Sequence, residues 1–203
     1  CSCIFRSALM LDPHILQQLA VRVDVTNYVR ILPRIYAASP LGMGFGLTRF
    51  SSSKNKFQLL YLAQNPITAV AETIVRDRFE KTTDRILLLE ELDRYSIALI
   101  RNPRPLFLLD LRFEGASLLG ISTDTVRAKA QAAGRRLSQE IYDRTEFDGI
   151  IYMSRITNKE CVAVYDRAVD PNLATDAPAL NLTMLSSLSD IFEKLFVTLI
   201  AEP

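Results

Sequence analysis

Several stretches of the chain carry hydrophobic residues three and four positions apart, which is the spacing of one face of an amphipathic helix. Two of these stretches begin with an N-cap residue followed by proline, a pair that suits the first turn of a helix, at Asp12-Pro13 and Asn65-Pro66. The pattern predicts an N-terminal helix over 13–24 and a second helix over 66–81. Alanines at helical spacing predict a third helix over 123–142.

A last apolar series predicts a C-terminal amphipathic helix over about 184–200. Its members alternate three and four positions apart, at Leu185, Leu188, Phe192, Leu195 and Leu199. The series is too short to indicate a coiled coil. Two alternatives stay open: the helix docks on its own domain, or it contacts a partner or a second copy of the chain.

Short runs rich in β-branched and aromatic residues predict strands between the helices. They occupy 28–32, 57–63, 85–92, 96–100, 106–111, 149–154 and 160–166. The strands do not alternate regularly with helices, so the pattern predicts an α+β fold with a mixed or antiparallel sheet and flanking helices. The stretch after Asp166 has the composition of a linker.

The composition is that of one folded domain spanning 1–203: hydrophobic residues make up 49% of the chain and charged residues 23%. A net charge of +1 gives no electrostatic reason to expect direct binding to nucleic acid. Apolar runs stay below the roughly 18 residues that a membrane helix needs, and the first ten residues lack the order of a signal peptide. We therefore expect a cytoplasmic protein that does not bind a membrane.

Cysteine and histidine are scarce. The three cysteines, Cys1, Cys3 and Cys161, cannot form a complete set of disulfides, and the single histidine is His14. A zinc site or a Ser-His-Asp hydrolase would depend on that one histidine. We expect no metal site.

The segment 39–55 is the most loop-like part of the chain, because it holds Gly42, Gly44 and Gly46 together with proline and serines. Glycine at this density indicates backbone that turns sharply or approaches another group closely. The glycines lack the preceding strand and the spacing of a dinucleotide-binding fingerprint.

Four local motifs and one accompanying tripeptide follow one another over about residues 30–166. They are Arg34-Ile35-Tyr36, Arg49-Phe50, Tyr61-Leu62-Ala63 with Ala69-Val70-Ala71-Glu72, Leu109-Asp110-Leu111, and Asp148-Gly149-Ile150-Ile151-Tyr152-Met153-Ser154-Arg155. In this order they resemble the RES family, which is named for its Arg, Glu and Ser motifs. The family usually has Gly-Gly before its second arginine and Asn after the following aromatic residue. This chain has Leu47-Thr48 and Ser51 there.

Typical RES members are toxins of bacterial toxin–antitoxin pairs that destroy NAD, and their fold resembles that of ADP-ribosyltransferases. The resemblance implies a pocket for NAD as substrate, no separate cofactor, and a cognate antitoxin as partner. The residues that match the family's arginines, tyrosine, glutamate and serine by position are Arg34, Arg49, Tyr61, Glu72 and Ser154. We expect these residues to converge on one cleft, with Tyr36 as a further NAD-binding residue.

The residue types suit this chemistry. A planar guanidinium matches phosphate oxygens, so Arg34 and Arg49 are candidates for phosphate binding. Loss of nicotinamide leaves an oxocarbenium-like ribose that a carboxylate stabilises, which makes Glu72 the catalytic candidate together with Arg49. A helical projection places Glu72 about 120° from the middle of its helix's apolar stripe, within reach of a cleft. Ser154 could hydrogen-bond a phosphate or ribose; it has no histidine or lysine base and is not assigned as a nucleophile.

Three functions stay open. The first is an NAD-consuming enzyme that cleaves the nicotinamide–ribose bond with phosphate or water as the acceptor, which makes phosphate a candidate co-substrate. The second is an ADP-ribosyltransferase that modifies a protein. The third is a catalytically silent RES-like module that binds a partner. The sequence also leaves open whether the chain forms a homo-oligomer.

Overall fold

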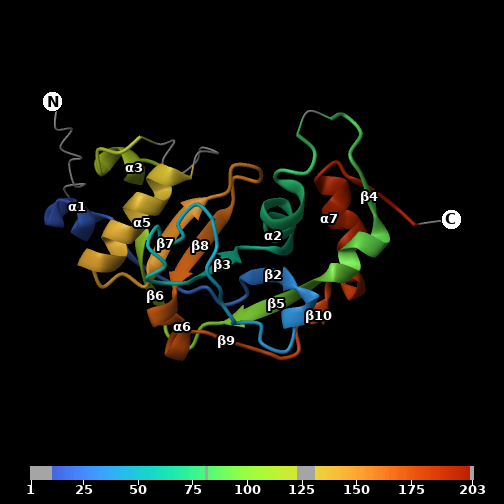
Figure 1. Ribbon diagram of the computed structural model, residues 1–203, viewed down its shortest axis with the longest axis horizontal. Coiled ribbons are helices and arrows are strands. Elements are labelled where there is room, and N and C mark those ends of the chain that lie inside the picture. The colour runs from blue at the N-terminus through green and yellow to red at the C-terminus, as the bar shows by residue number, and fades with distance from the viewer. Residues whose placement is uncertain (1–10, 81, 123–130, 202–203) are drawn as a thin grey trace.

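The computed structural model describes residues 11–80, 82–122 and 131–201, and Figure 1 shows a curled mixed sheet with helices around it. The sheet has nine strands in the order β1-β6-β7-β8-β3-β2-β5-β10, with β9 paired to β5. All neighbours are antiparallel except β6 and β7, which are parallel. The strands are β1 (Ala20–Val23), β2 (Val29–Pro33), β3 (Leu59–Ala63), β5 (Tyr95–Arg101), β6 (Leu106–Asp110), β7 (Gly149–Met153), β8 (Glu160–Tyr165), β9 (Ala174–Thr175) and β10 (Leu180–Asn181).

Helices and a separate pair of strands complete the described part of the chain. Strands β4 (Ile86–Leu88) and β11 (Thr198–Ile200) form a small parallel sheet. The α-helices are α1 (Pro13–Gln18), α2 (Pro66–Val70), α3 (Gly115–Leu118), α5 (Ala132–Arg144), α6 (Asp166–Asn172) and α7 (Leu188–Lys194). Short 3-10 helices are η1 (Arg34–Tyr36), η3 (Leu89–Arg94) and η4 (Leu182–Met184), and a π-helical segment, η2 (Ala71–Val75), follows α2. The predicted α+β class with a mixed sheet is confirmed.

The two faces of the large sheet bury two hydrophobic clusters, because side chains alternate along each strand. On β3, Leu59 and Tyr61 belong to the larger cluster, to which α2, α5 and α7 contribute. Leu60 and Leu62 belong to the smaller cluster on the other face, which α6 covers with Ala168 and Val169. Figure 1 shows α5 in the left half of the molecule, α2 near the middle and α7 to the right of α2. On the larger cluster, α5 therefore stands apart from α2 and α7.

The sheet splits between β2 and β3. β2 pairs with β5 over five positions, and β3 pairs with β8 over five positions. Between β2 and β3 the only register position is Val29 opposite Ala63. Beyond this pair the two strands diverge, so the edges that face the gap must be covered by side chains, water or a ligand.

Gly149 allows β7 and β8 to approach each other closely. A Cβ atom at this position would lie 2.2 Å from the carbonyl oxygen of Ala163 on β8, which is a severe clash. Glycine therefore lets β7 begin in full register with β8. The register matters because β7 carries Tyr152 and leads directly into Ser154.

Several predicted element boundaries are wrong. The N-terminal helix ends at Gln18 rather than at residue 24, because the valines of β1 pair with β6 and bury apolar surface there. The helix predicted over 66–81 is α2 followed by the π-helical segment, which ends at Val75. The strand predicted over 85–92 stops at Leu88 and continues as η3.

The remaining differences concern the second half of the chain. Of the helix predicted over 123–142, residues 123–130 lie outside the described part, and α5 runs on to Arg144. The stretch after Asp166 is no linker: it forms α6 and then β9 and β10, which both pair with β5. Backbone pairing to the edge of the sheet orders a segment whose composition suggested a loop.

The C-terminal helix is shorter than predicted. It spans Leu188–Lys194, and the chain then forms β11 beside β4 instead of continuing to residue 200. The apolar series is nevertheless buried: Leu188, Phe192 and Leu195 belong to the larger cluster. Of the two alternatives, the structure shows docking of this segment on its own domain.

Within the described residues, helices are too short or too polar to cross a lipid bilayer.

We predict that Phe192→Ala lowers the free energy of unfolding by about 3–5 kcal/mol, because the ring is 1% exposed and its removal leaves a cavity. The matched control is Phe196→Ala in the same segment, where the ring is 84% exposed and a change within about 0.5 kcal/mol is expected. Urea unfolding of both variants measures the difference. Equal stability of the two would show that the terminal segment is not part of the core.

Candidate functional site

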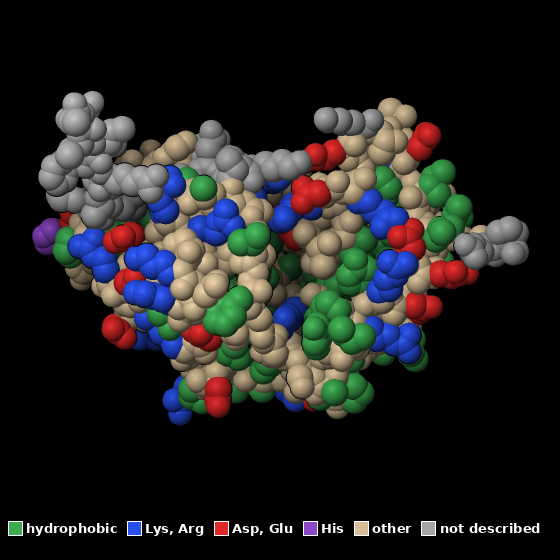
Figure 2. Space-filling model, in the orientation of Figure 1, with side chains coloured by type: hydrophobic (Ala, Val, Ile, Leu, Met, Phe, Trp, Pro, Cys, Tyr) green, Lys and Arg blue, Asp and Glu red, His purple; other side chains and the backbone are tan. Residues whose placement is uncertain are grey.

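A cavity of about 340 Å³ occupies the gap between β2 and β3, which is a common size for a small-molecule site. Strands β2, β3, β7 and β8, the last turn of α2, the π-helical segment and the loop before Phe50 all contribute to its wall. The lining residues are Val29, Arg30, Ile31, Thr48, Arg49, Leu59, Tyr61, Leu62, Ala63, Ala69, Glu72, Thr73, Arg76, Tyr152 and Cys161. Figure 2 shows a hollow at the centre of this face, with Lys or Arg side chains inside it and acidic side chains near its upper edge.

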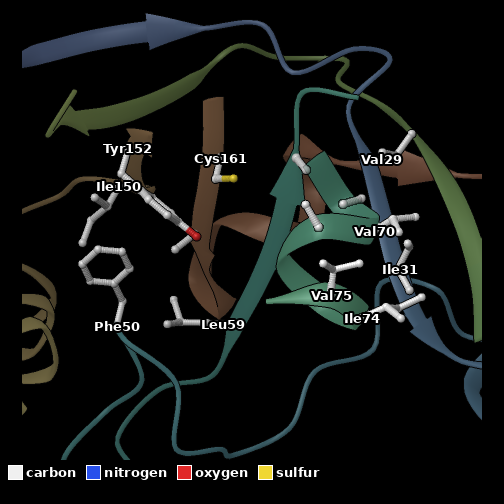
Figure 3. Close-up of a cluster of buried hydrophobic side chains, with 14 of the residues drawn as sticks. Val29, Ile31, Phe50, Leu59, Val70, Ile74, Val75, Ile150, Tyr152 and Cys161 are labelled. Atoms are coloured by element: carbon white, nitrogen blue, oxygen red, sulfur yellow. The ribbon is translucent and has the colours of Figure 1, made fainter. Parts of the chain in front are cut away.

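The loop that carries Arg49 is fixed from both sides. Phe50 is fully buried, and its ring packs edge-on against Tyr152 with centroids 5.1 Å apart. Figure 3 shows these two rings side by side, with Leu59 beneath Phe50. The Tyr61 hydroxyl oxygen accepts a hydrogen bond from the Phe50 amide at 3.2 Å and lies 2.7 Å from the Thr48 hydroxyl. Tyr61 therefore anchors the loop to β3.

Arg49 is a buried cation without a hydrogen-bonding partner among the described residues. Arg49 is 6% exposed, and its Nε is buried without a hydrogen-bond acceptor. The guanidinium lies 5.9 Å from the centre of the Tyr152 ring, a favourable cation–π distance. Burial lowers the pKa of Arg49 from its ordinary value. A guanidinium has five N–H donors, so an anionic ligand in the cavity would satisfy groups that the protein leaves unpaired.

Glu72 stands at the start of the π-helical segment, directly after α2. Asn65 caps α2 by accepting the Thr68 amide at 2.9 Å, and Pro66 follows at the first helical position. The wider turn of a π-helix shifts side chains relative to an α-helix and is frequent at functional sites. The Glu72 side chain is 15% exposed, and its Oε2 lies 3.3 Å from the Arg76 guanidinium.

Ser154 fixes the other oxygen of Glu72. The Ser154 hydroxyl donates to Glu72 Oε1 at 2.7 Å and accepts the backbone amides of Ile156 and Thr157, both at 3.2 Å. The first of these hydrogen bonds joins the end of β7 to the π-helical segment, and the other two hold the turn that follows β7. Ser154 therefore orients a carboxylate, and its bonds agree with the view that it is no nucleophile.

Arg30 and Cys161 are further groups on the cavity wall. Arg30 projects from β2, donates to the Pro40 carbonyl at 2.6 Å, and has its pKa lowered to about 10 by burial. It stays charged at neutral pH. Burial raises the pKa of the Cys161 thiol to about 12, so this thiol stays protonated and is a poor nucleophile.

The structure brings together most, but not all, of the residues singled out from the sequence. Arg49, Tyr61 and Glu72 line the cavity, and Ser154 contacts Glu72. Arg34 and Tyr36 lie in η1, beyond the end of β2, and do not line it. Their NAD-binding roles stay predictions. Among the described residues, no group of His, Cys, Asp or Glu is placed to hold a metal ion.

Sequence reasoning missed Arg30 and Arg76. Arg30 alternates with the buried residues Val29 and Ile31 on β2, and a charged residue inside such a strand signals a polar cavity or a buried pair. Arg76 stands four positions after Glu72, a spacing that places the two side chains together on a helix. Both signals were present, but each also fits a solvated arginine.

The sequence and the fold match those of known proteins. The family model of the RES domain matches residues 27–184, and the chain belongs to this family. It is 36% identical over 93 residues to a protein of Sinorhizobium fredii named probable toxin y4kH; the matched region is 45% of this chain and 73% of that protein. The fold also matches the crystal structure of the MbcT–MbcA toxin–antitoxin complex of M. tuberculosis. This match has a TM-score of 0.57 at 16% identity. It covers 83% of this chain and 94% of the matched chain in that complex.

We predict that Ser154→Ala lowers the free energy of unfolding by about 1–3 kcal/mol, because it leaves two backbone amides and one carboxylate oxygen without their partner. The matched control is Ser96→Ala on β5, since Ser96 is similarly buried but its hydroxyl has no hydrogen-bond partner in the described parts of the chain. Thermal and urea unfolding of the two variants test this. An equal loss at both sites would mean that the Ser154 bonds contribute nothing.

Proposed function

We propose that the protein is a toxin-like enzyme that consumes NAD by cleaving the bond between nicotinamide and ribose. Phosphate or water accepts the ADP-ribose. The observation that carries this proposal is the arrangement in one cavity of a buried arginine without an acceptor, Arg49, and a carboxylate held by a serine, Glu72. Membership of the RES family supports the same reaction.

The charge of the cavity suits a dinucleotide. Three arginines line it, at positions 30, 49 and 76, against the single carboxylate of Glu72. Arg76 is already paired with Glu72 and Asp77, whereas Arg49 has no hydrogen-bond partner in the described chain. Guanidinium groups bind phosphate oxygens through two parallel N–H donors, so Arg49 is the first candidate for the pyrophosphate and Arg30 the second.

Glu72 suits the bond-breaking step. When the C–N bond breaks, its electron pair goes to the nicotinamide nitrogen and neutralises that ring, and positive charge develops on the ribose. A carboxylate near the ribose stabilises this charge directly or through the ribose hydroxyls. Phosphate or water then adds to the anomeric carbon and loses a proton to solvent. Ser154 and Arg76 hold the carboxylate in one orientation before the reaction, which lowers the reorganisation cost.

The names of the relatives support a cognate antitoxin. One relative is named a probable toxin, and the matched crystal structure is a toxin–antitoxin complex. An enzyme that destroys NAD would harm its own cell without control. We propose that an antitoxin protein inhibits this chain by covering the cavity or docking beside it.

We predict that Glu72→Gln lowers NAD turnover by about two to three orders of magnitude, which corresponds to roughly 3–4 kcal/mol of transition-state stabilisation. The change keeps the size of the side chain and removes its charge. The free energy of unfolding should change by less than about 1 kcal/mol, as for most partly exposed positions. NAD consumption followed by chromatography, beside a thermal melt, measures both quantities.

The matched control is Glu140→Gln on α5. Glu140 also forms an ion pair with an arginine four residues later, at 3.4 Å, but it does not line the cavity. Turnover by this variant should equal that of the unaltered protein. If Glu72→Gln also turns over NAD normally at an unchanged melting temperature, Glu72 has no catalytic role.

We predict that Arg49→Ala raises KM and thereby lowers kcat/KM for NAD, because a phosphate contact that exists in the ground state and in the transition state alike contributes equally to the binding of both. Steady-state kinetics with NAD, with and without phosphate, separate an effect on KM from one on kcat and identify the acceptor from the product. A lower kcat at constant KM would contradict a phosphate-binding role for Arg49. Labelled NAD mixed with cell lysate reveals any transfer of ADP-ribose to protein.

A further inference from the structure

A second, smaller hollow opens beside the main cavity and has no role in the reaction described above. It has a volume of about 160 Å³ and shares four lining residues with the main cavity, at positions 30, 48, 59 and 61. Its remaining wall comes from the glycine-rich loop, residues 42–46, of which 44–46 line the hollow, and from the segment 51–58. This region lies between β2 and β3, in the part of the chain coloured light blue to cyan in Figure 1.

The residues that line the two spaces indicate which way a bound dinucleotide would run. Glu72 and Arg49 line only the main cavity, Arg30 lines both spaces, and Phe45 lines only the smaller hollow. A dinucleotide with its scissile bond at Glu72 and its phosphates at Arg49 and Arg30 therefore extends its other half toward Phe45. In NAD that other half is adenosine.

The smaller hollow also carries side chains of the kinds that suit an adenine base. Phe45 is 59% exposed, an unusual position for a large aromatic side chain, and it stands between Gly44 and Gly46. An exposed aromatic face stacks on a base. The side-chain amides of Asn55 and Gln58 make no hydrogen bond to the described protein, and such an amide matches the amino group and ring nitrogen of adenine.

We infer that this hollow is the subsite for the adenine base of NAD and that Phe45 is a specificity-determining residue that stacks on the base. The inference rests on the proposed function for its substrate. The inference also accounts for the glycines of this loop, because glycines on both sides of Phe45 allow the backbone to place the ring over a bound base. The smaller hollow thus selects a dinucleotide over a substrate that lacks adenosine.

The test compares NAD with nicotinamide mononucleotide, which has the same scissile bond and one phosphate but no adenosine. Phe45→Ala should lower kcat/KM for NAD about tenfold or more and leave kcat/KM for the mononucleotide unchanged, because a stacked base contributes binding only where adenosine is present. Phe45→Trp keeps an aromatic face and should restore most of the preference for NAD. The matched control is Leu47→Ala in the same loop, since Leu47 is 83% exposed and lines neither space.

A binding measurement makes the inference independent of turnover. Calorimetric titration with AMP should show weaker binding to Phe45→Ala than to the unaltered protein, whereas ribose 5-phosphate, which lacks the base, should bind both alike. If the unaltered protein does not consume NAD but its affinity for AMP depends on Phe45, the proposed reaction fails and the adenine subsite stands. If Phe45→Ala leaves both the NAD preference and the AMP affinity unchanged, or lowers activity on both substrates equally, the subsite is overturned.

Discussion

The site depends on one feature of backbone pairing: β2 and β3 meet at Val29 and Ala63 and then separate. Each strand is fully paired on its other side, to β5 or to β8, so neither can shift to close the gap without losing five register positions. The gap is therefore as rigid as the two half-sheets that border it. The backbone pairing alone keeps this cavity open, without a conformational change. Side chains from distant parts of the chain can line it.

Polar contacts across the gap then fix the reactive groups. Tyr61 holds the loop that carries Arg49, and Ser154 holds Glu72. Both contacts use hydroxyl groups on the β3 and β7 side of the gap to orient charged residues from a loop and from a π-helical segment. Charged groups on flexible elements gain a defined position in this way, and electrostatic stabilisation of a transition state requires such preorganisation. Arg49 Nε is buried without a hydrogen-bond partner among the described residues, which leaves this cation available for an anion in the cavity.

The proposed function joins the two spaces into a single dinucleotide site. On this proposal the larger cavity holds the chemistry at Glu72, and the smaller hollow beside Phe45 sets which substrates bind with high affinity. Arg30 links the two, because it lines both and remains charged at neutral pH. In this view the glycine-rich loop determines specificity, while the family's arginine and glutamate motifs determine the reaction.

The sequence by itself determined the α+β class, most strands, the start of α2 and the chemical types at the site, because these follow from local periodicity, capping and motif order. It placed Arg34, Arg49, Tyr61, Glu72 and Ser154 on one cleft, and the structure brings the last four of these together. It assigned Arg34, which lies in η1 beyond the end of β2, and missed Arg30, which lies within β2. Only the split of the sheet decides which one faces the cavity. Tertiary pairing likewise ended the first helix at Gln18 and turned the terminal segment into α7 and β11, because burial and backbone pairing outweigh the small free-energy differences of local propensity.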